Sequence, residues 1–350
     1  MITHLALKQF RNHAALNLDF NSNLVAITGP NASGKTNILE ALYISSLTKS
    51  FKNTDNKLVM HGGNFFTIDK VDNNTNVHIR FTQTDLSRAK ALKVNKVAKP
   101  LYSIIGQSPI TLFEPNDLYL LTGLPSLRRN YLDKILSQVD KVYLQNLRQY
   151  KKIVHHRNSL LKRAKKENVG NINEQLFVLN IQLAKPGYYL TKKRQEFISS
   201  LAKSLNNYYQ LISGESAKIV VEFNESASSS QDLLNKIEDA VQKDRVCGFS
   251  TVGPHKEDFS VSLRGHNLTD SASRGELRSL VLACKLSELD YIEKKLSRRP
   301  TLLLDDVLSE LDDARQKFLL SSLSMQQTFL TTTHLPDNLK LNFQHIELPL

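Results

Sequence analysis

The sequence predicts an α/β fold in which a mixed sheet with flanking helices is interrupted by an inserted, mostly helical second lobe. Three observations predict it. Apolar residues alternate through much of 1–115, long helical patterns with almost no glycine fill 126–212, and strand patterns return from 218. We therefore expect a head made of 1–125 and 235–350, with a helical lobe, 126–234, inserted in it.

The N-terminal part should be rich in strands. Alternating apolar stretches predict strands at 2–10, 15–20, 65–69 and 77–82, separated by turn residues such as asparagine and glycine. A single helical pattern, KTNILEALYISS at 35–46, interrupts them. This order of strands and one early helix is typical of an α/β head.

The inserted lobe should consist of long helices. In 143–163 apolar residues recur close to a heptad seam, and a turn is expected at 166–173. A second helical run begins at Glu174 and should break or kink at Pro186-Gly187, because proline lacks the N–H and clashes with the preceding turn. A third run spans about 190–212.

The C-terminal third should complete the head. Strands are expected at 218–223, 258–263, 301–305 and 328–333, with helices near 231–243, 275–296 and 310–323.

Charge and cysteine content narrow the functional classes. Lys+Arg 46 against Asp+Glu 34 gives a formal charge of +12, which favours a polyanionic partner such as nucleic acid. The alternative interpretation is a soluble protein whose positive charge has no functional role. Cys247 and Cys284 have no metal-site spacing, and two isolated thiols fit a reducing compartment. Without a secretory leader pattern or a long apolar span, we expect a cytoplasmic protein with no membrane partner.

The first chemical motif is a glycine-rich loop between a buried-type strand and a helix. It comprises Gly29, Pro30, Asn31, Ala32, Ser33, Gly34, Lys35, Thr36 and Asn37. Small residues let backbone N–H groups face phosphates, and the helix N-terminus adds positive potential. Lys35 should reach the β- and γ-phosphates of ATP, as a catalytic group, and the Thr36 hydroxyl should ligate Mg²⁺. A simple glycine-rich turn is the alternative.

The second motif is an apolar strand, 301–304, that ends in two acids. In P-loop proteins a carboxylate at this place holds the magnesium, and Asp305 fits that role. Asp306 should point to the other side of the strand and orient the attacking water as a catalytic residue. The alternative is a strand that ends in a helix cap, for which Asp306 and Ser309 are both suited.

The order of the motifs resembles that of ABC-type ATPases. A P-loop is followed by SRGE before a helix, by LLLDD, by SELD and by TTTH. The resemblance implies a signature turn, Ser273, Gly275 and Glu276, that caps the γ-phosphate held by a second, head-to-tail subunit. It also implies a D-loop containing Ser309 and Asp312, and a switch histidine, His334. A lone histidine after a strand can equally be a surface residue.

More specifically, the chain resembles the RecF family, which is related to SMC proteins. The resemblance rests on FRNH (10–13), PNDLYLLTGLPSLRRNYLD (115–133), GPHKEDF (253–259) and LLLDDVLSELDDARQKFL (302–319), and it covers nearly the whole chain. It adds Arg11 to the expected nucleotide-binding residues. It implies a P-loop ABC-type ATPase head that dimerises with ATP and hydrolyses it weakly in a DNA-dependent manner, without nuclease activity.

The resemblance also implies a role in DNA replication, DNA repair and the SOS response. The protein would recognise gapped or single-strand–double-strand junction DNA and, with RecO- and RecR-type partners, promote recombinase loading. Candidate phosphate contacts are Lys151, Lys152, Arg157, Lys162 and Arg163. A solvated helix face is the alternative interpretation of that charge run.

Two other functional classes compete with this interpretation. The first is the ATPase subunit of an ABC transporter, which also carries a helical insertion before the signature turn. The charge and the SRGE turn count against it. The second is a scaffold with a degenerate nucleotide site, which the intact Lys35, Thr36, Asp305 and Asp306 count against.

Overall fold

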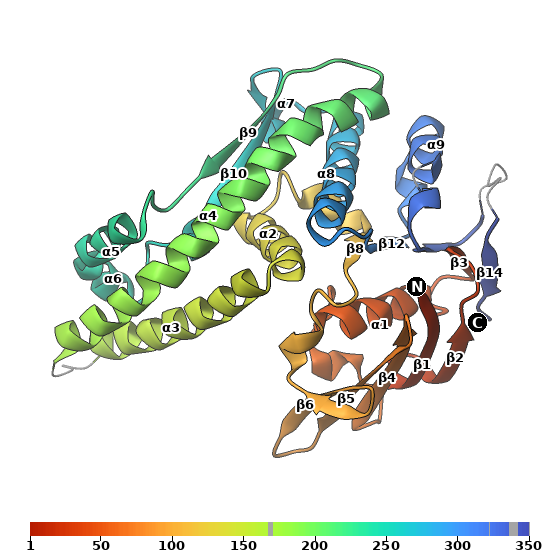
Figure 1. The fold of residues 1–350 in the computed structure, drawn as a ribbon, viewed down its shortest axis with the longest axis horizontal. Helices are drawn as coiled ribbons and strands as arrows, with labels where there is room; N and C mark the ends of the chain where they lie inside the picture. The colour runs from red at the N-terminus through yellow and green to blue at the C-terminus, as the bar shows by residue number, and fades with distance from the viewer. Residues whose placement is uncertain (167–170, 322, 336–341, 350) are drawn as a thin grey trace. The chain divides into compact units, whose positions relative to one another are not determined.

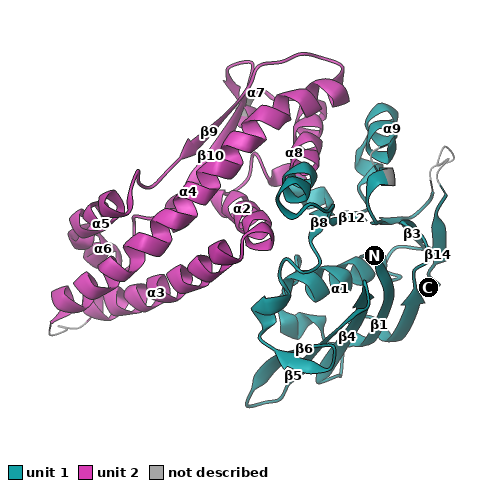
Figure 2. Ribbon diagram, in the orientation of Figure 1, with its two compact units in different colours: residues 1–117, 288–350 teal, residues 118–287 magenta. Residues whose placement is uncertain are grey.

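The computed structural model describes residues 1–166, 171–321, 323–335 and 342–349. The chain forms two compact units, shown in Figure 2. Unit 1 contains 1–117 and 288–350, and unit 2 contains 118–287. The lobe expected at 126–234 lies within this longer unit, which also contains 118–125 and 235–287 of the expected head.

Unit 1 contains a six-stranded antiparallel sheet in the order β2-β1-β4-β5-β6-β7. Its strands are β1 (Ile2–Phe10), β2 (His13–Asp19), β4 (Phe65–Asp72), β5 (Thr75–Gln83), β6 (Arg88–Val94) and β7 (Val97–Lys99). Alternate residues of β4 and β5 are buried, as the sequence alternation predicted. Phe66 pairs with Phe81, and Ile68 pairs with Ile79, on the buried face.

The second sheet of unit 1 is parallel, in the order β14-β3-β13-β12-β8. Its strands are β3 (Leu24–Thr28), β8 (Ile110–Phe113), β12 (Thr301–Asp305), β13 (Thr328–Thr332) and β14 (Gln344–Glu347). Every residue of β3 and β13 is buried, which is typical of parallel strands covered on both faces. The carboxyl ends of these strands therefore meet at one edge, where ligands usually bind in such sheets.

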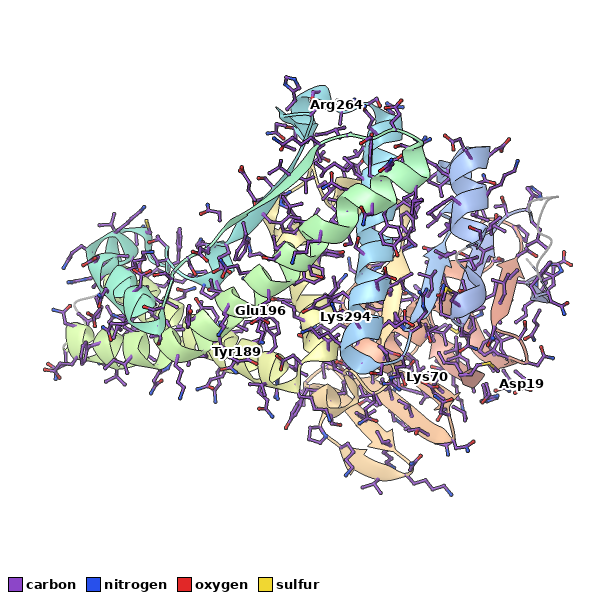
Figure 3. All side chains as sticks on the ribbon, turned by 45° about the horizontal axis from the view of Figure 1, so that its top comes forward. Asp19, Lys70, Tyr189, Glu196, Arg264 and Lys294 are labelled. Carbon is purple, nitrogen blue, oxygen red and sulfur yellow. The ribbon has the colours of Figure 1, made fainter. Side chains whose placement is uncertain are left out.

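Helix α1 (Lys35–Leu47) follows β3 and contributes to a hydrophobic core shared with strands of both sheets of unit 1. Lys70, labelled in Figure 3, is buried beside this core although it is a lysine. Its Nζ donates to Ser46 Oγ at 3.0 Å. Burial lowers the pKa of Lys70 to about 8, although Asp72 acts in the opposite direction. Helix α9 (Asp313–Ser321) follows β12.

Unit 2 combines helices with a small antiparallel sheet in the order β11-β10-β9, and Figure 1 labels β9 and β10. Its elements are α2 (Pro125–Val139), α3 (Lys141–Lys166), α4 (Ile172–Ser213), β9 (Ile219–Asn224), α5 (Ser230–Asp239), α6 (Val241–Cys247), β10 (Asp258–Leu263), β11 (His266–Asn267), α7 (Leu268–Ser271) and the first part of α8 (Arg274–Leu296). The strands expected at 218–223 and 258–263 exist, but they pair with each other and not with the head sheets. This pairing explains why unit 2 extends past 234.

The expected break at Pro186-Gly187 does not occur. Helix α4 continues through both residues, and both are buried. A Cβ added to Gly187 would lie 2.7 Å from Leu233 Cδ2 and 3.1 Å from Tyr150 Cε2. The glycine therefore lets α5 and α3 pack closely on α4, and this packing offsets the cost of a proline inside the helix.

Two segments that carried the family resemblance are bonded to each other in unit 2. Arg128 of α2 donates to both carboxylate oxygens of Asp258, each at 2.7 Å, and Arg129 Nη1 donates to the Glu257 carbonyl at 2.9 Å. The buried Arg194 of α4 donates to Glu257 Oε2 and to Asp133 Oδ1. These charged pairs join α2 and α4 to Glu257 and Asp258 at the start of β10. The charged residues of the two motifs therefore stabilise the fold of unit 2.

One-turn 3₁₀ segments connect several elements. They are Asp55–Leu58, Leu101–Ile104, Pro115–Tyr119, Pro254–Lys256, Leu308–Glu310 and Leu323–Met325. The turn expected at 166–173 includes 167–170, which lie outside the described residues.

Candidate functional site

The predicted P-loop lies between β3 and α1 in unit 1, as its sequence context required. Gly29, Ala32 and Gly34 have positive φ values of 150°, 70° and 101°. A Cβ on Gly34 would lie 2.4 Å from His13 Nε2 and 2.8 Å from Asn12 Oδ1, so only glycine fits there. Gly34 is also the N-cap of α1 and has no side chain to cover the first N–H groups of the helix. These N–H groups are therefore suited to an anion.

Lys35 folds back over the loop. Its Nζ donates to the carbonyl oxygens of Gly29 at 2.7 Å and Pro30 at 2.8 Å. Both acceptors belong to the loop expected to surround the phosphates. The ammonium group is thus held where phosphate oxygens could replace the carbonyls as acceptors.

The two sequence motifs meet at Thr36 and Asp305. Thr36 Oγ1 donates to Asp305 Oδ1 at 2.6 Å. Thr331 Oγ1 of β13 donates to the same oxygen at 3.0 Å, and Lys52 Nζ lies 3.1 Å from Oδ2. Asp305 is buried, and these donors hold its carboxylate at the end of β12 beside the start of α1.

The second acid is placed by a turn and not by strand alternation. Strand β12 ends at Asp305, and Asp306 has a φ of 52°. Its N–H donates to the Thr331 carbonyl and to Thr331 Oγ1, both at 3.1 Å. Burial and the Asp305 carboxylate raise the pKa of Asp306 above its ordinary value, although Lys35 acts in the opposite direction. A carboxylate with a raised pKa beside the P-loop lysine suits the expected role with water.

The segment after β1 supports the P-loop through Asn12 and His13, which belong to the FRNH segment but were not assigned a role from the sequence. Asn12 Nδ2 donates to the Ala32 carbonyl at 3.1 Å, and Asn37 Nδ2 donates to Asn12 Oδ1 at 2.7 Å. His13 Nε2 lies 3.3 Å from the Gly34 carbonyl, and burial lowers its pKa. The FRNH segment was the only sequence signal for these contacts.

Arg11, the residue of that segment expected to bind nucleotide, contacts other groups. Its Nε and Nη2 donate to the two oxygens of the buried Glu40 at 2.9 and 3.0 Å, and Nη1 donates to the Lys57 carbonyl at 3.1 Å. Arg11 thus connects the turn after β1 to Glu40 of α1. Its nucleotide contact remains a prediction.

Three further expected residues follow strands of the same sheet. His334 is exposed, and its carbonyl accepts a hydrogen bond from Thr332 Oγ1 at 2.9 Å, just after β13. Ser309 Oγ donates to the Asp306 carbonyl at 2.8 Å. Asp312 Oδ1 accepts from the Arg315 N–H at 3.0 Å and so caps α9. The cap after β12 is therefore Asp312, not Asp306 or Ser309.

The signature turn belongs to unit 2, at the start of α8. Ser273 Oγ accepts from the Glu276 N–H at 3.2 Å, and the Ser273 N–H donates to Glu276 Oε2 at 2.9 Å. This is a capping box, in which the first and fourth residues satisfy each other's backbone N–H groups. Ser273 therefore caps the N-terminus of α8, and an exposed cap can also contact a phosphate.

The basic residues of α3 do not all face solvent. Lys152, Lys162 and Arg163 are exposed, and the largely exposed Lys151 lies 2.9 Å from Asp133 Oδ2. Arg157 is fully buried, with Nη1 2.6 Å from Asp244 Oδ2, so its assignment as a DNA contact is wrong. It lies in the buried row of α3 with Tyr150, Ile153, Leu160 and Leu161, and this helical spacing was the signal that could have excluded it.

The residues of unit 1 fit a magnesium nucleotide. Thr36 Oγ1 and Asp305 Oδ1 are adjacent hard oxygen atoms of the kind that Mg²⁺ prefers, and phosphates and water usually supply the remaining ligands of such an ion. The Ser33 hydroxyl in the loop is buried and has no hydrogen-bond partner among the described residues, which suits a ligand with acceptor oxygens. Within the described ranges, no helix is both long and apolar enough to span a bilayer.

Comparisons with known proteins agree with this geometry. A family model described as an AAA domain matches residues 4–296. The DNA replication and repair protein RecF of Agathobacter rectalis is 35% identical, covering 98% of this chain and 95% of the relative. RecF of Halalkalibacterium halodurans is 36% identical, covering 95% and 92%.

Solved structures give the same result. The recombination mediator protein RecF-ATP of the RecFOR pathway has a TM-score of 0.88 and 32% identity, with 96% of this chain and 92% of that chain covered. An Smc head domain from Pyrococcus furiosus, bound to part of ScpA, has a TM-score of 0.52 and 16% identity over 95% and 89%, which shows the fold alone. The fold predicted from the sequence, an ABC-type ATPase head with a helical lobe, is confirmed, and the chain belongs to the RecF family of DNA replication and repair proteins.

Proposed function

We propose that this chain is an ATP-dependent DNA-binding repair protein whose ATP binding drives head-to-tail dimerisation and whose slow, DNA-stimulated hydrolysis reverses it. The observation that carries the proposal is the contact between Thr36 and Asp305 beside Lys35. It brings the phosphate loop and the metal carboxylate together in unit 1. A relative whose structure is described as RecF-ATP supports ATP as the nucleotide.

In this proposal Lys35 and the α1 N-terminus bind the phosphates, and Thr36 and Asp305 hold Mg²⁺, which supplies charge neutralisation. Asp306 orients the water, and Asn12 and His13 hold the loop in shape. His334 and Arg11 are kept as candidate nucleotide contacts, and Ser309 and Asp312 as D-loop residues. Lys35, Thr36, Asp305 and Asp306 are all present, which counts against a scaffold protein with a degenerate nucleotide site.

The signature turn supplies the second half of each site. Ser273, Gly275 and the start of α8 present a hydroxyl and backbone N–H groups at an exposed helix end, which suits a γ-phosphate. We therefore propose two composite sites per dimer, each with the P-loop of one copy and the signature turn of the other.

DNA is the proposed polyanionic partner. The exposed Lys152, Lys162 and Arg163 on α3 can neutralise phosphates without reading bases, which fits gapped or junction DNA bound independently of sequence. A solved RecF belongs to the RecFOR pathway, which supports RecO- and RecR-type partners and a role in recombinase loading. Because chromosomal DNA of bacteria lies in the cytoplasm, we propose that the protein acts there. Relatives covering nearly the whole chain are RecF proteins, which counts against a transporter subunit.

Mixing two inactive variants tests the composite site. Ser273→Arg removes the signature contact, and Lys35→Ala removes the phosphate lysine, so neither variant should have a working site when paired with itself. An equimolar mixture should form dimers with one complete site and regain ATPase activity above the sum of the separate variants. Ser271→Arg, two residues before the turn and exposed, is the matched control and should remain active. No recovery, with mixed dimers shown to form, would disprove a site built from two copies.

A further inference from the structure

Glu276 of the signature turn occupies both hydrogen-bond donors of Ser273. Its Oε2 accepts from the Ser273 N–H at 2.9 Å and from the Ser273 hydroxyl at 2.8 Å. The serine hydroxyl therefore points at a carboxylate of its own chain. A γ-phosphate from a second copy would have to compete with that carboxylate for the same proton.

Arg264 holds the other oxygen of this carboxylate. Its Nη1 donates to Glu276 Oε1 at 2.6 Å, and its Nη2 donates to Glu215 Oε2 at 2.8 Å. The Ser273 hydrogen bonds and the Arg264 guanidinium lower the pKa of Glu276, so the carboxylate is ionised at neutral pH.

The backbone fixes where Arg264 lies. It occupies the two-residue turn between β10 and β11, where Leu263 pairs with His266, and it has a left-handed φ of 54° (Figure 3). Its N–H donates to the Lys218 carbonyl at 2.8 Å. A turn that favours asparagine or glycine thus carries an arginine, and the side chain extends from it to the start of α8.

The family resemblance placed Glu276 among the residues that cap the γ-phosphate, but its ionised carboxylate opposes the binding of a phosphate at this turn. A phosphate and Glu276 are both negative, and their repulsion is strongest when the approaching surfaces exclude water. Capping of α8 does not require Arg264, because glutamine or glutamate alone completes a capping box. Stability does not explain the arginine well either, because an ion pair with a half-exposed arginine contributes little.

We infer that Arg264 is a positioning residue of the signature turn: it holds and neutralises Glu276, so that Ser273 can donate its hydroxyl to the ATP phosphate of a second copy. The inference rests on the proposed function, because it requires ATP-driven assembly. Arg264 acts through Glu276 and contacts no nucleotide itself.

Arg264→Ala should weaken ATP-driven dimerisation at least tenfold, measured by sedimentation of the full chain with ATP and Mg²⁺. Its affinity for ATP as a monomer should match wild type, because the P-loop belongs to unit 1. Arg264→Lys should restore part of the assembly. Because the defect is electrostatic, the ratio of wild-type to Arg264→Ala affinity should fall as KCl rises from about 0.05 to 0.5 M.

The double variant Arg264→Ala/Glu276→Gln gives the sharpest test. Glutamine keeps the capping box but removes the charge that Arg264 neutralises, so the double variant should assemble nearly as well as wild type. Glu215→Gln is the matched control: it removes the other partner of Arg264 and should leave assembly intact. A purely structural arginine predicts instead that the double variant stays defective and that the defect does not change with salt.

The outcomes separate the two proposals. If wild type does not dimerise with ATP, the proposed function fails and this inference fails with it. If wild type dimerises and Arg264→Ala does so equally well, only the inference is wrong. Continued failure of the double variant would likewise overturn the inference alone.

Discussion

Thr36 and Asp305 are separated by 269 positions in the chain, yet their side chains are joined by a 2.6 Å hydrogen bond. The contact follows from the parallel sheet. Strands β3 and β12 both pair with β13, so their carboxyl ends lie at one edge, and Thr331 of β13 also donates to Asp305. The motifs that the sequence presents far apart therefore form one site.

Lys35→Ala should abolish ATP binding. The substitution removes the ammonium group that Gly29 and Pro30 hold over the loop, and with it the charge expected to reach the β- and γ-phosphates. Equilibrium binding of a fluorescent ATP analogue measures the loss. Lys8→Ala, an exposed lysine of β1, is the control and should bind as wild type does. Wild-type affinity in Lys35→Ala would contradict the P-loop assignment.

Asp306→Asn should bind ATP and dimerise but hydrolyse slowly, because Asp305 keeps its contact with Thr36. The raised pKa of Asp306 adds a pH signature. Its ionised form should act on water, so the wild-type rate should fall as pH falls through that raised pKa. The variant should lack this acid limb. Loss of ATP binding instead would mean that the two aspartates have exchanged roles.

Lys70→Met should stabilise the protein at pH 7. The folded protein releases the Lys70 proton near pH 8 and the unfolded chain near 10.5, so this group makes the free energy of unfolding rise between those values. Methionine avoids burying the charge and should gain up to about 3 kcal/mol at pH 7. The gain should disappear by pH 10.5. Urea unfolding at several pH values measures it, with the exposed Lys8→Met as control. A gain unchanged by pH would show that Lys70 is not the titrating group.

Arg157→Ala should unfold the protein more easily without a specific effect on DNA binding. It leaves Asp244 buried without its charged partner, which costs about 3–5 kcal/mol. Urea unfolding measures the loss of stability, and DNA affinity is compared at a temperature where the variant is still folded. A selective fall in DNA affinity of the folded variant would contradict the structural role of Arg157.

Charge reversal of the exposed basic residues of α3 should affect DNA binding and not stability. Lys152→Glu, Lys162→Glu and Arg163→Glu together should weaken DNA binding at little cost in stability. The salt dependence of log K should become shallower by about 0.9 for each DNA phosphate that the variant no longer neutralises. Fluorescence anisotropy on gapped DNA at several salt concentrations measures both effects. An unchanged salt slope would remove α3 from the DNA-binding surface.

Local pattern predicted much of the fold. Strand alternation identified β1 and β5 closely, a continuous apolar run identified β12, and the glycine-rich loop with its following helix predicted the start of α1. What it could not predict was which strands pair. Strands 219–224 and 258–263 look like head strands in sequence, and their mutual pairing is a long-range contact with no local signal.

The candidate site also contains residues that the sequence predicted and residues that it could not predict. Gly34, Lys35, Thr36 and Asp305 follow from a motif whose spacing is set by phosphate chemistry. Asn12, His13 and Lys52 have no such spacing, because their contacts depend on where β1 and the segment after α1 lie in three dimensions. Pro186 failed as a helix breaker because tertiary packing around Gly187 outweighs its local cost.

The strand order also sets when the nucleotide site can form during synthesis. Strand β3 pairs with β13 and β14, which follow it by about 300 positions in the chain and are therefore synthesised much later. At ordinary translation rates β3 and the P-loop wait on the order of half a minute for their partners. The apolar β3 and α1 are exposed to chaperones and to aggregation during that interval. A chain that stops before β13 therefore keeps all of its P-loop residues but lacks the strands that shape the loop.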